Sequence, residues 1–287
     1  MTGFYNILKP SGCTSSQVVT KVKKILTAYS GEKHNTVGHM GTLDPGGAGV
    51  LPVATGRATR LFDYLLDKKK TYRAAFAFST TTDTLDSYGK VTARSDRTVS
   101  SEEIAAVLPS LTGVVDQIPP IYSAKSIGGV KAYRLARAGE ELSMKPRRVE
   151  IHRIDMVEQI SENVFVFDIE CGGGTYVRSI CRDMAEKLGT VGYMAYIIRT
   201  KCGNLDIADS HTTDELSENP EKFLIPVDKI LELESIVPTE KEYFRLVNGL
   251  CVDCDRGDGL YYVRHDGTIT GIACAETGKL KFRTRLL

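Results

Sequence analysis

The order of strand and helix patterns constrains the fold of this chain more than any other sequence feature. Alternating apolar residues predict a strand around Tyr72–Phe78 and two further strands near 148–157 and 163–171. Apolar residues at helical spacing predict helices that begin near Thr14, Thr55, Ser100 and Thr175. Because strands and helices mix without a strict βαβ rhythm, we expect an α+β body rather than a doubly wound parallel sheet.

The C-terminal part of the chain has a different character. An acidic, proline-containing stretch around 206–240 is typical of a linker region with a little helix. Short alternating segments follow, separated by turn residues such as Asn248-Gly249 and Asp266-Gly267. We therefore predict two domains, a body over 1–235 and a small β-rich domain over 236–287.

The charge distribution is uneven although the net charge is only +1. Residues 205–287 carry 10 Lys and Arg against 16 Asp and Glu, which leaves 27 against 20 for residues 1–204. A basic body beside an acidic segment fits a polyanion bound on one face. Ordinary solvated surface explains the charges equally well.

The seven cysteines and the N-terminal residues indicate an intracellular setting. An odd number of scattered cysteines argues against a disulfide framework. A zinc site would need four ligands, and the available ones are Cys251, Cys254, Cys274 and His265. Their spacing matches no common zinc motif, so we expect these cysteines to be buried or strand-facing thiols instead. The chain opens without a signal-peptide pattern and contains no apolar run of about 18 residues. We expect a cytoplasmic protein with no membrane association.

Common cofactor motifs are missing from the sequence. The interval from Gly49 to Gly56 is too long for a phosphate-binding P-loop, and Arg57 follows it where that motif has Lys. Neither a G-x-G-x-x-G motif between a strand and a helix nor an H-E-x-x-H motif occurs. We therefore expect no cofactor and no metal.

The most unusual segment runs from Gly38 to Pro52, within a glycine-rich stretch over 31–56 that we expect to be irregular. Pro45 restricts the backbone of Asp44 towards an extended conformation, and five glycines permit close approach by a ligand or another segment. Such a loop presents a carboxylate with little freedom. Taken alone, an Asp-Pro-Gly run more often forms a simple turn.

The same segment resembles the G-H-x-G-x-L-D-P motif, continuing to G-V-L-P, of the bacterial tRNA pseudouridine-55 synthases, the TruB family. Other motifs similar to those of the family occur in the expected order, at Lys9–Ser15, Lys70–Tyr72, Thr82–Gly89, Gln117–Ala124 with Tyr133, Ala136 and Arg137, and Gly174–Arg178. The resemblance covers residues 9 to about 203, and the tail from about 240 more weakly resembles a PUA-type RNA-binding domain. The implied fold is a pseudouridine synthase fold, a mixed sheet flanked by helices and loops, with a PUA-like domain.

The resemblance implies three catalytic residues. Asp44 would act at the ribose C1′ or the uracil ring while the N-glycosidic bond is broken and remade to C5. Arg178 would pair with Asp44 and aim it, because an arginine fork suits a carboxylate. Tyr72 would lie beside the flipped uracil and serve the transfer of the C5 proton. Without the resemblance, Tyr72 would be a core residue of its strand.

Further residues would bind the substrate. Tyr176 and Ile197 would line the pocket, and His39 would touch the RNA where the base has left its stack; a buried structural histidine is the alternative. Lys9 and Lys70 belong to motifs of the family and complete the predicted substrate-binding set. Basic residues that would contact phosphate, or else simply face solvent, are Lys68, Lys69, Lys70, Arg147, Arg148, Arg178, Arg182, Arg199 and Lys201.

Two positions depart from the family's pattern. Ser126 stands where the family commonly has Lys, with Lys125 just before it, and Ile198 stands where it has the first arginine of L-R-R-T. These changes put two RNA contacts in doubt. Asp44, Tyr72 and Arg178 are unaffected, so we expect activity to survive.

The function implied by the resemblance is isomerisation of uridine 55 in the T-arm loop of tRNA, by a monomer that needs no guide RNA. A non-catalytic tRNA-binding or tRNA-folding protein on the same scaffold is the alternative. That protein would be expected to lose the carboxylate or its arginine partner, and this chain keeps both. A glycoside hydrolase would need a second acid in a comparable loop, and the sequence has none.

Overall fold

The computed structural model describes residues 1–33, 36–66, 68–123, 126–127, 129–132, 135, 138 and 144–286. The predicted motif positions at Ala124, Lys125, Tyr133, Ala136 and Arg137 lie outside these residues. Ser126 falls in the short β8, but its side chain is not described. No helix in the described ranges is long and apolar enough to cross a membrane.

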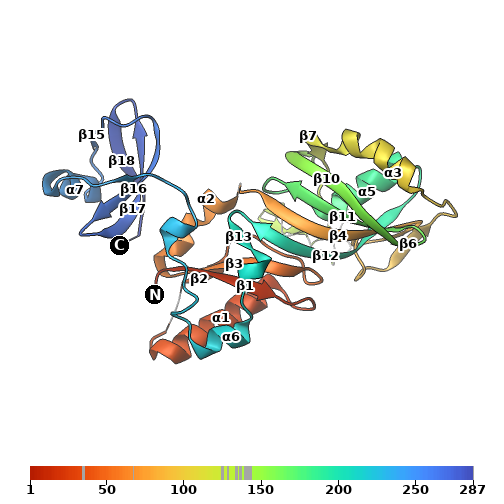
Figure 1. Ribbon diagram of the computed structural model, residues 1–287, viewed down its shortest axis with the longest axis horizontal. Coiled ribbons are helices and arrows are strands. Elements are labelled where there is room, and N and C mark those ends of the chain that lie inside the picture. The colour runs from red at the N-terminus through yellow and green to blue at the C-terminus, as the bar shows by residue number, and fades with distance from the viewer. Residues whose placement is uncertain are drawn as a thin grey trace.

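One nine-stranded mixed sheet forms the body of the molecule (Figure 1). Its order is β1-β3-β12-β4-β11-β10-β7, with β2 beside β3 and β13 beside β12. Only β3 and β12 pair in parallel among these strands. The strands are β1 Gly3–Lys9, β2 Val37–His39, β3 Ala48–Thr55, β4 Lys70–Phe78, β7 Gly113–Gln117, β10 Arg147–Ser161, β11 Val164–Cys171, β12 Gly192–Cys202 and β13 Leu205–Asp206. Two small hairpins lie outside it, β5 Thr80–Thr82 with β6 Val91–Arg94, and β8 Ser126–Ile127 with β9 Val130–Lys131.

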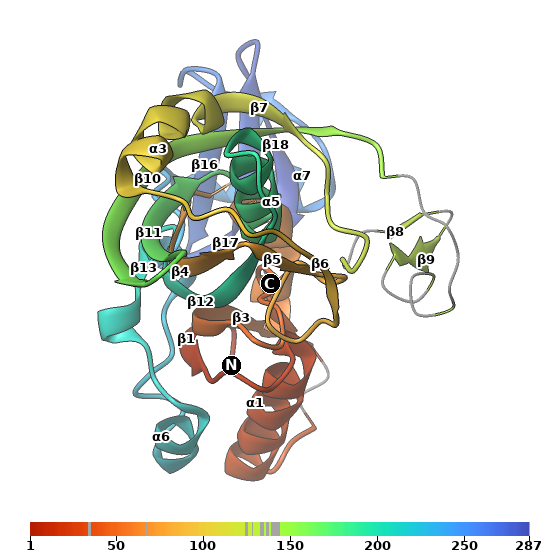
Figure 2. The same ribbon diagram turned by 90° about the vertical axis from the view of Figure 1, so that its right-hand side faces the viewer.

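The main core lies between this sheet and the helices that cover it. Phe76 of β4 and Phe167 of β11 are fully buried, with ring centroids 4.9 Å apart. Helix α5 (Val177–Lys187) packs on β4 and β12, and α3 (Ser101–Val107) packs against α5 (Figure 2). Burial of such apolar side chains contributes about 25 cal/mol per Å² and is the main stabilisation of the body.

Four helices begin where side chains satisfy their free N–H groups. Capping boxes at Thr14, Ser100, Thr212 and Thr239 start α1, α3, α6 and α7. Among the described residues, the other helix bounds are α1 Ser15–Ser30, α2 Phe62–Leu66, α6 Thr213–Glu218 and α7 Glu240–Val247. The 3-10 turns are η1 Gly56–Leu61, η2 Leu108–Leu111, η3 Ile207–Asp209 and η4 Val227–Lys229. Helix α6 packs on α1, where Lys21 Nζ lies 2.7 Å from Asp214 Oδ1.

A second, five-stranded sheet forms the C-terminal domain at one end of the long axis of the molecule (Figure 1). Its order is β14-β16-β17-β18-β15, made of β14 Ser235–Ile236, β15 Val252–Asp253, β16 Gly259–His265, β17 Thr268–Glu276 and β18 Lys279–Arg285. Tyr262 fixes this sheet to the preceding segment, because its hydroxyl shares its proton between the carbonyls of Val227 at 2.8 Å and Leu231 at 2.9 Å. Strand β14 crosses the boundary predicted at 235/236, so that division stays a prediction.

The predicted α+β class with a β-rich C-terminal domain is confirmed, as are the strands at β4, β10 and β11 and the helices α1, α3 and α5. The expectation of an irregular stretch over 31–56 is wrong, because β2 and β3 lie within it. The helix predicted near Thr55 is a 3-10 turn that continues into the short α2. The central strand β12 was not predicted.

Candidate active site

A cavity of about 320 Å³ opens beside the segment that carries Asp44. Its walls come from five places in the sequence: the loop over 41–44, the start of β4, the start of β10, the residues before and at the start of α5, and β12. Since β4 and β12 are adjacent strands, the sheet forms one wall and the two loop segments form the others. The cavity is of the size that encloses a small ligand or one nucleoside unit.

Asp44 and Arg178 form an ion pair in this cavity. The Oδ2 atom of Asp44 lies 2.8 Å from Nη2 of Arg178. The arginine side chain is only 4% exposed, whereas that of Asp44 is 36% exposed. The buried guanidinium therefore holds a carboxylate that still faces the opening.

The surroundings of Arg178 fix the orientation of its guanidinium. Nη1 donates to the carbonyl of Thr84 at 3.0 Å, and Nη2 donates to that of Tyr122 at 3.1 Å. Asp86 Oδ2 lies 3.8 Å from Nη1 and adds a second negative charge. The expectation that Arg178 contacts phosphate or faces solvent is wrong, because the side chain is buried and already paired.

The backbone on either side of Asp44 is hydrogen-bonded to the first residue of α1 and to the turn before this helix. The hydroxyl of Ser15 donates to the carbonyl of Leu43 and accepts from its N–H, both at 2.9 Å. The N–H of Gly12 donates to the carbonyl of Pro45 at 2.9 Å. These contacts fix the backbone on both sides of Asp44.

Lys9 is completely buried beneath this loop. Its ammonium donates to the carbonyls of Pro10 at 2.9 Å, Pro45 at 3.3 Å and Gly47 at 2.5 Å, and burial lowers its pKa. Lys9 does not line the cavity. The prediction that Lys9 contacts the substrate is therefore not supported by its position. All three N–H groups of the ammonium are used to hold the loop, which leaves none for a ligand.

Arg199 holds the other side of the same loop. It is 1% exposed, and it donates to the carbonyls of Val50 at 2.7 Å, Gly41 at 3.2 Å and Thr42 at 3.4 Å. The prediction that Arg199 contacts phosphate is wrong, because its guanidinium is buried and already bonded to carbonyls of the loop. Arg199 forms part of the cavity wall, but almost none of its side chain is exposed.

Tyr72, Met194 and Ile197 give the cavity an apolar wall on the sheet side. Burial raises the pKa of the Tyr72 phenol, and the nearby Arg199 offsets only part of that effect. The phenol is therefore neutral around pH 7 and retains its proton. Flat apolar surfaces with one hydroxyl suit an uncharged heterocycle.

Tyr176 and Lys70 also line the cavity. Gln117 fixes the backbone of Tyr176: its Oε1 accepts from the Tyr176 N–H at 2.8 Å, and its Nε2 donates to the Tyr176 carbonyl at 3.2 Å. Lys70 is buried, and its ammonium donates to the carbonyl of Lys68 at 2.8 Å. Both positions agree with the predicted set, although the roles remain predictions.

His39 lies at the end of β2, outside the residues that line the cavity. Burial, and secondly the charge of Arg199, lower the pKa of its imidazole. Its buried Nδ1 atom has no hydrogen-bond partner within the described part of the chain. The predicted contact between His39 and RNA remains a prediction.

Sequence reasoning missed three residues of the site. Met194 belongs to the strand that was not predicted, and Asp86 was noted only as part of a motif. Arg147 lines the cavity but had been grouped with Arg148 as a general phosphate contact. Its place directly before the strand predicted near 148–157 was the available signal.

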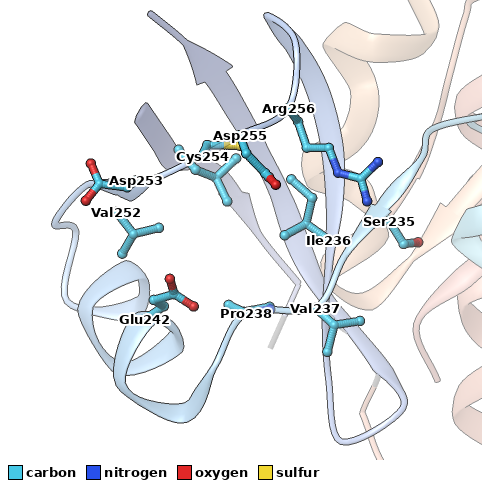
Figure 3. A pocket seen from close by; sticks show the side chains of 11 residues that line it. Ser235, Ile236, Val237, Pro238, Glu242, Val252, Asp253, Cys254, Asp255 and Arg256 are labelled. Carbon is cyan, nitrogen blue, oxygen red and sulfur yellow. The ribbon is translucent and has the colours of Figure 1, made fainter. Parts of the chain in front are cut away.

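A second cavity, of about 380 Å³, lies in the C-terminal domain. Figure 3 shows the carboxylates of Glu242, Asp253 and Asp255 and the guanidinium of Arg256 around it. Glu242 caps α7 through Thr239. The acidic rim repels phosphate, and no catalytic pairing like that of Asp44 and Arg178 occurs in it, so the first cavity is the candidate active site.

Within the described residues, one group could offer three ligands to a metal ion: Glu240, His265 and Asp266. Nε2 of His265 lies 2.9 Å from Glu240 Oε1, and its ring stacks on Tyr243 with centroids 3.8 Å apart. A hydrogen bond and a ring stack account for this arrangement. The zinc hypothesis for Cys251, Cys254, Cys274 and His265 finds no such grouping among the described residues.

Sequence comparison identifies the family. The profile of the TruB family pseudouridylate synthase N-terminal domain matches residues 23–177, and that of the tRNA pseudouridylate synthase B C-terminal domain matches residues 178–232. A protein of Caldanaerobacter subterraneus subsp. tengcongensis is 38% identical over 284 residues, 97% of each chain. One of Alkaliphilus oremlandii is 41% identical over 249 residues, 86% of this chain and 81% of its own. Both are named tRNA pseudouridine synthase B.

Solved structures share the fold. A chain of a Cbf5-Nop10-Gar1 complex has a TM-score of 0.73 at 22% identity, over 99% of this chain and 85% of its own. A chain of an H/ACA ribonucleoprotein bound to a substrate RNA containing 2'-deoxyuridine has a TM-score of 0.72 at 21% identity, with the same coverage. These structures establish the architecture, and the sequence matches establish the relationship. The chain belongs to the TruB family of pseudouridylate synthases.

Proposed function

We propose that this chain converts uridine 55 in the T-arm loop of tRNA to pseudouridine, with Asp44 as its catalytic carboxylate. The observation that carries the proposal is the pairing of a partly exposed Asp44 with a buried Arg178 inside a cavity of nucleoside size. The tRNA pseudouridine synthase B names of the relatives support the same substrate class.

The reaction is an isomerisation and needs no co-reactant. The bond from ribose C1′ to N1 of uracil breaks, the ring turns, and a bond from C1′ to C5 forms. The proton on C5 leaves, and N1 ends with a proton. Asp44 acts at C1′ or on the ring while the base is detached, and Arg178 holds its carboxylate in place.

Tyr72, Met194 and Ile197 hold the uracil ring by apolar contact. Tyr72 also takes part in the transfer of the C5 proton as the hydroxyl on that wall. Because burial keeps the phenol protonated, it accepts this proton only as it passes its own to N1 or to water. The cavity encloses its ligand, so the uridine has to leave the base stack before it can enter. Base flipping is therefore part of the proposed mechanism.

We also propose how the enzyme recognises its RNA, in which oligomeric state it acts and where in the cell. The enzyme acts as a monomer in the cytoplasm, recognises the T-arm stem-loop directly and uses no guide RNA. The β-rich C-terminal domain is a PUA-like module that contributes to RNA binding. Its acidic cavity implies that RNA contacts a different face of the module.

Incubation of the purified protein with unmodified tRNA transcript, without metal or nucleotide, tests the proposal. Chemical mapping should find one new pseudouridine, at position 55, and none when cytidine replaces that uridine. Asp44→Asn should abolish the product, whereas Asp214→Asn, at an exposed carboxylate on α6, should not. Tight binding of tRNA by the wild type without any product would overturn the catalytic proposal in favour of a tRNA-binding or tRNA-folding protein.

A further inference from the structure

Tyr88 is an exposed aromatic residue that lies against the catalytic loop. Its side chain belongs to the turn between β5 and β6, and the residue is 64% exposed. The ring reaches Gly46, two positions after Asp44. A Cβ atom on Gly46 would lie 2.4 Å from Cε2 of the ring, so any other residue there would displace the ring from this position.

The backbone of Tyr88 is connected to the catalytic ion pair. Its N–H donates to Asp86 Oδ1 at 3.0 Å, and the hydroxyl of Thr84 donates to the same oxygen at 2.6 Å. The other carboxylate oxygen of Asp86 lies 3.8 Å from Arg178 Nη1. The turn that presents Tyr88 is therefore fixed relative to Asp44 and Arg178.

A turn that holds an aromatic ring in water beside the loop of Asp44 is an unusual position for a tyrosine. An aromatic side chain gains most by burial, and this ring is buried on the loop side only. Proteins that bind unstacked RNA bases use such rings as stacking surfaces. When one uridine enters the cavity, the bases next to it lose a stacking neighbour.

We propose that Tyr88 is a stacking platform for a base adjacent to the flipped uridine. The proposal rests on the proposed function, because it requires a single-stranded loop at the mouth of the cavity. The platform is a substrate-binding residue and leaves the chemistry at Asp44 unchanged. Stacking uses the face of the ring, so the tyrosine hydroxyl is dispensable.

Steady-state kinetics of full-length variants on unmodified tRNA test this assignment. Tyr88→Ala should raise KM about tenfold and leave kcat within about twofold, whereas Tyr88→Phe should match the wild type. Tyr29→Ala, at an exposed tyrosine near the end of α1, is the matched control. A fall in kcat at unchanged KM, with a lower melting temperature, would mean that the ring only covers the loop, and would overturn the proposal.

A binding experiment separates this proposal from the proposed function. A tRNA that carries 2-aminopurine next to position 55 should lose fluorescence on binding the wild type and Tyr88→Phe, and lose less on binding Tyr88→Ala at saturation. This measurement needs no turnover, so it decides the role of Tyr88 even if no pseudouridine forms. Equal quenching by Tyr88→Ala and the wild type at both neighbouring positions would overturn the stacking assignment.

Discussion

The ammonium of Lys9 and the guanidinium of Arg199 hold opposite ends of the loop that carries Asp44. Lys9 binds the carbonyls that follow Asp44, at Pro45 and Gly47, and Arg199 binds those before it, at Gly41 and Thr42. Both cations are buried. The position of the proposed catalytic carboxylate thus depends on two buried cations.

Arg199→Met removes the support on one side of the loop. The carbonyls of Gly41, Thr42 and Val50 lose their donor, and an unpaired buried acceptor costs about 1–3 kcal/mol. We expect the melting temperature to fall by roughly 10 °C, and kcat to fall with it. Thermal unfolding and single-turnover rates measure both effects. Lys201→Met, at an exposed residue of the same strand, is the control, and an unchanged melting temperature for Arg199→Met would contradict the loop-holding role.

Local patterns were sufficient to predict β4 and α5. In β4 the large side chains of Tyr72, Phe76 and Phe78 recur at even spacing on one face. In α5 the apolar stripe ends before Gly189, whose φ of 67° stops the helix. Strand β12 has no comparable pattern, because irregularities after Met194 and Arg199 shift its register against β4. Each shift moves the following side chains to the other face, which breaks the period of two.

The site itself depends on contacts that no local pattern contains. Glycines in 31–56 suggested a loop, but Gly49 marks a close strand approach: a Cβ there would lie 2.2 Å from the carbonyl oxygen of Arg199. A buried arginine cannot be predicted from its neighbours when the carbonyls it satisfies lie up to 158 positions away. The pairing of Asp44 with Arg178 was expected only because of the family resemblance.

Arg178→Lys tests whether the shape of the guanidinium matters. A lysine keeps the charge but cannot contact Asp44, Thr84 and Tyr122 in the same fixed geometry. We expect kcat to fall at least about a hundredfold, with KM within about threefold, because the carboxylate is misplaced while the RNA contacts remain. Arg182→Lys, one turn further along α5, should keep kcat within about threefold. Comparable losses in both variants would point to damage of the helix instead.

Arg147→Gln should weaken the binding of tRNA through a phosphate contact. Its exposed guanidinium lines the cavity and has no partner among the residues that the structure describes. Loss of one phosphate contact should reduce the slope of log Kd against log salt concentration by about one. Arg148→Gln is the matched control, because the next residue of a strand points to the other face. Identical slopes for Arg147→Gln and the wild type would exclude the contact.

His39→Gln should make the stability of the protein less sensitive to mild acid. The folded protein holds the pKa of His39 below the unfolded value of about 6.5, through burial and the charge of Arg199. As the pH falls below about 6.5, the unfolded chain therefore takes up a proton that folded His39 resists, and the free energy of unfolding decreases. Urea unfolding at pH 7.5 and pH 5.5 measures this loss, which should be smaller in His39→Gln. Between pH 7.5 and 8.5 the imidazole is neutral in both states, so the variant and the wild type should change in parallel there. An equal loss of stability in mild acid for both proteins would show that His39 does not resist protonation in the folded state.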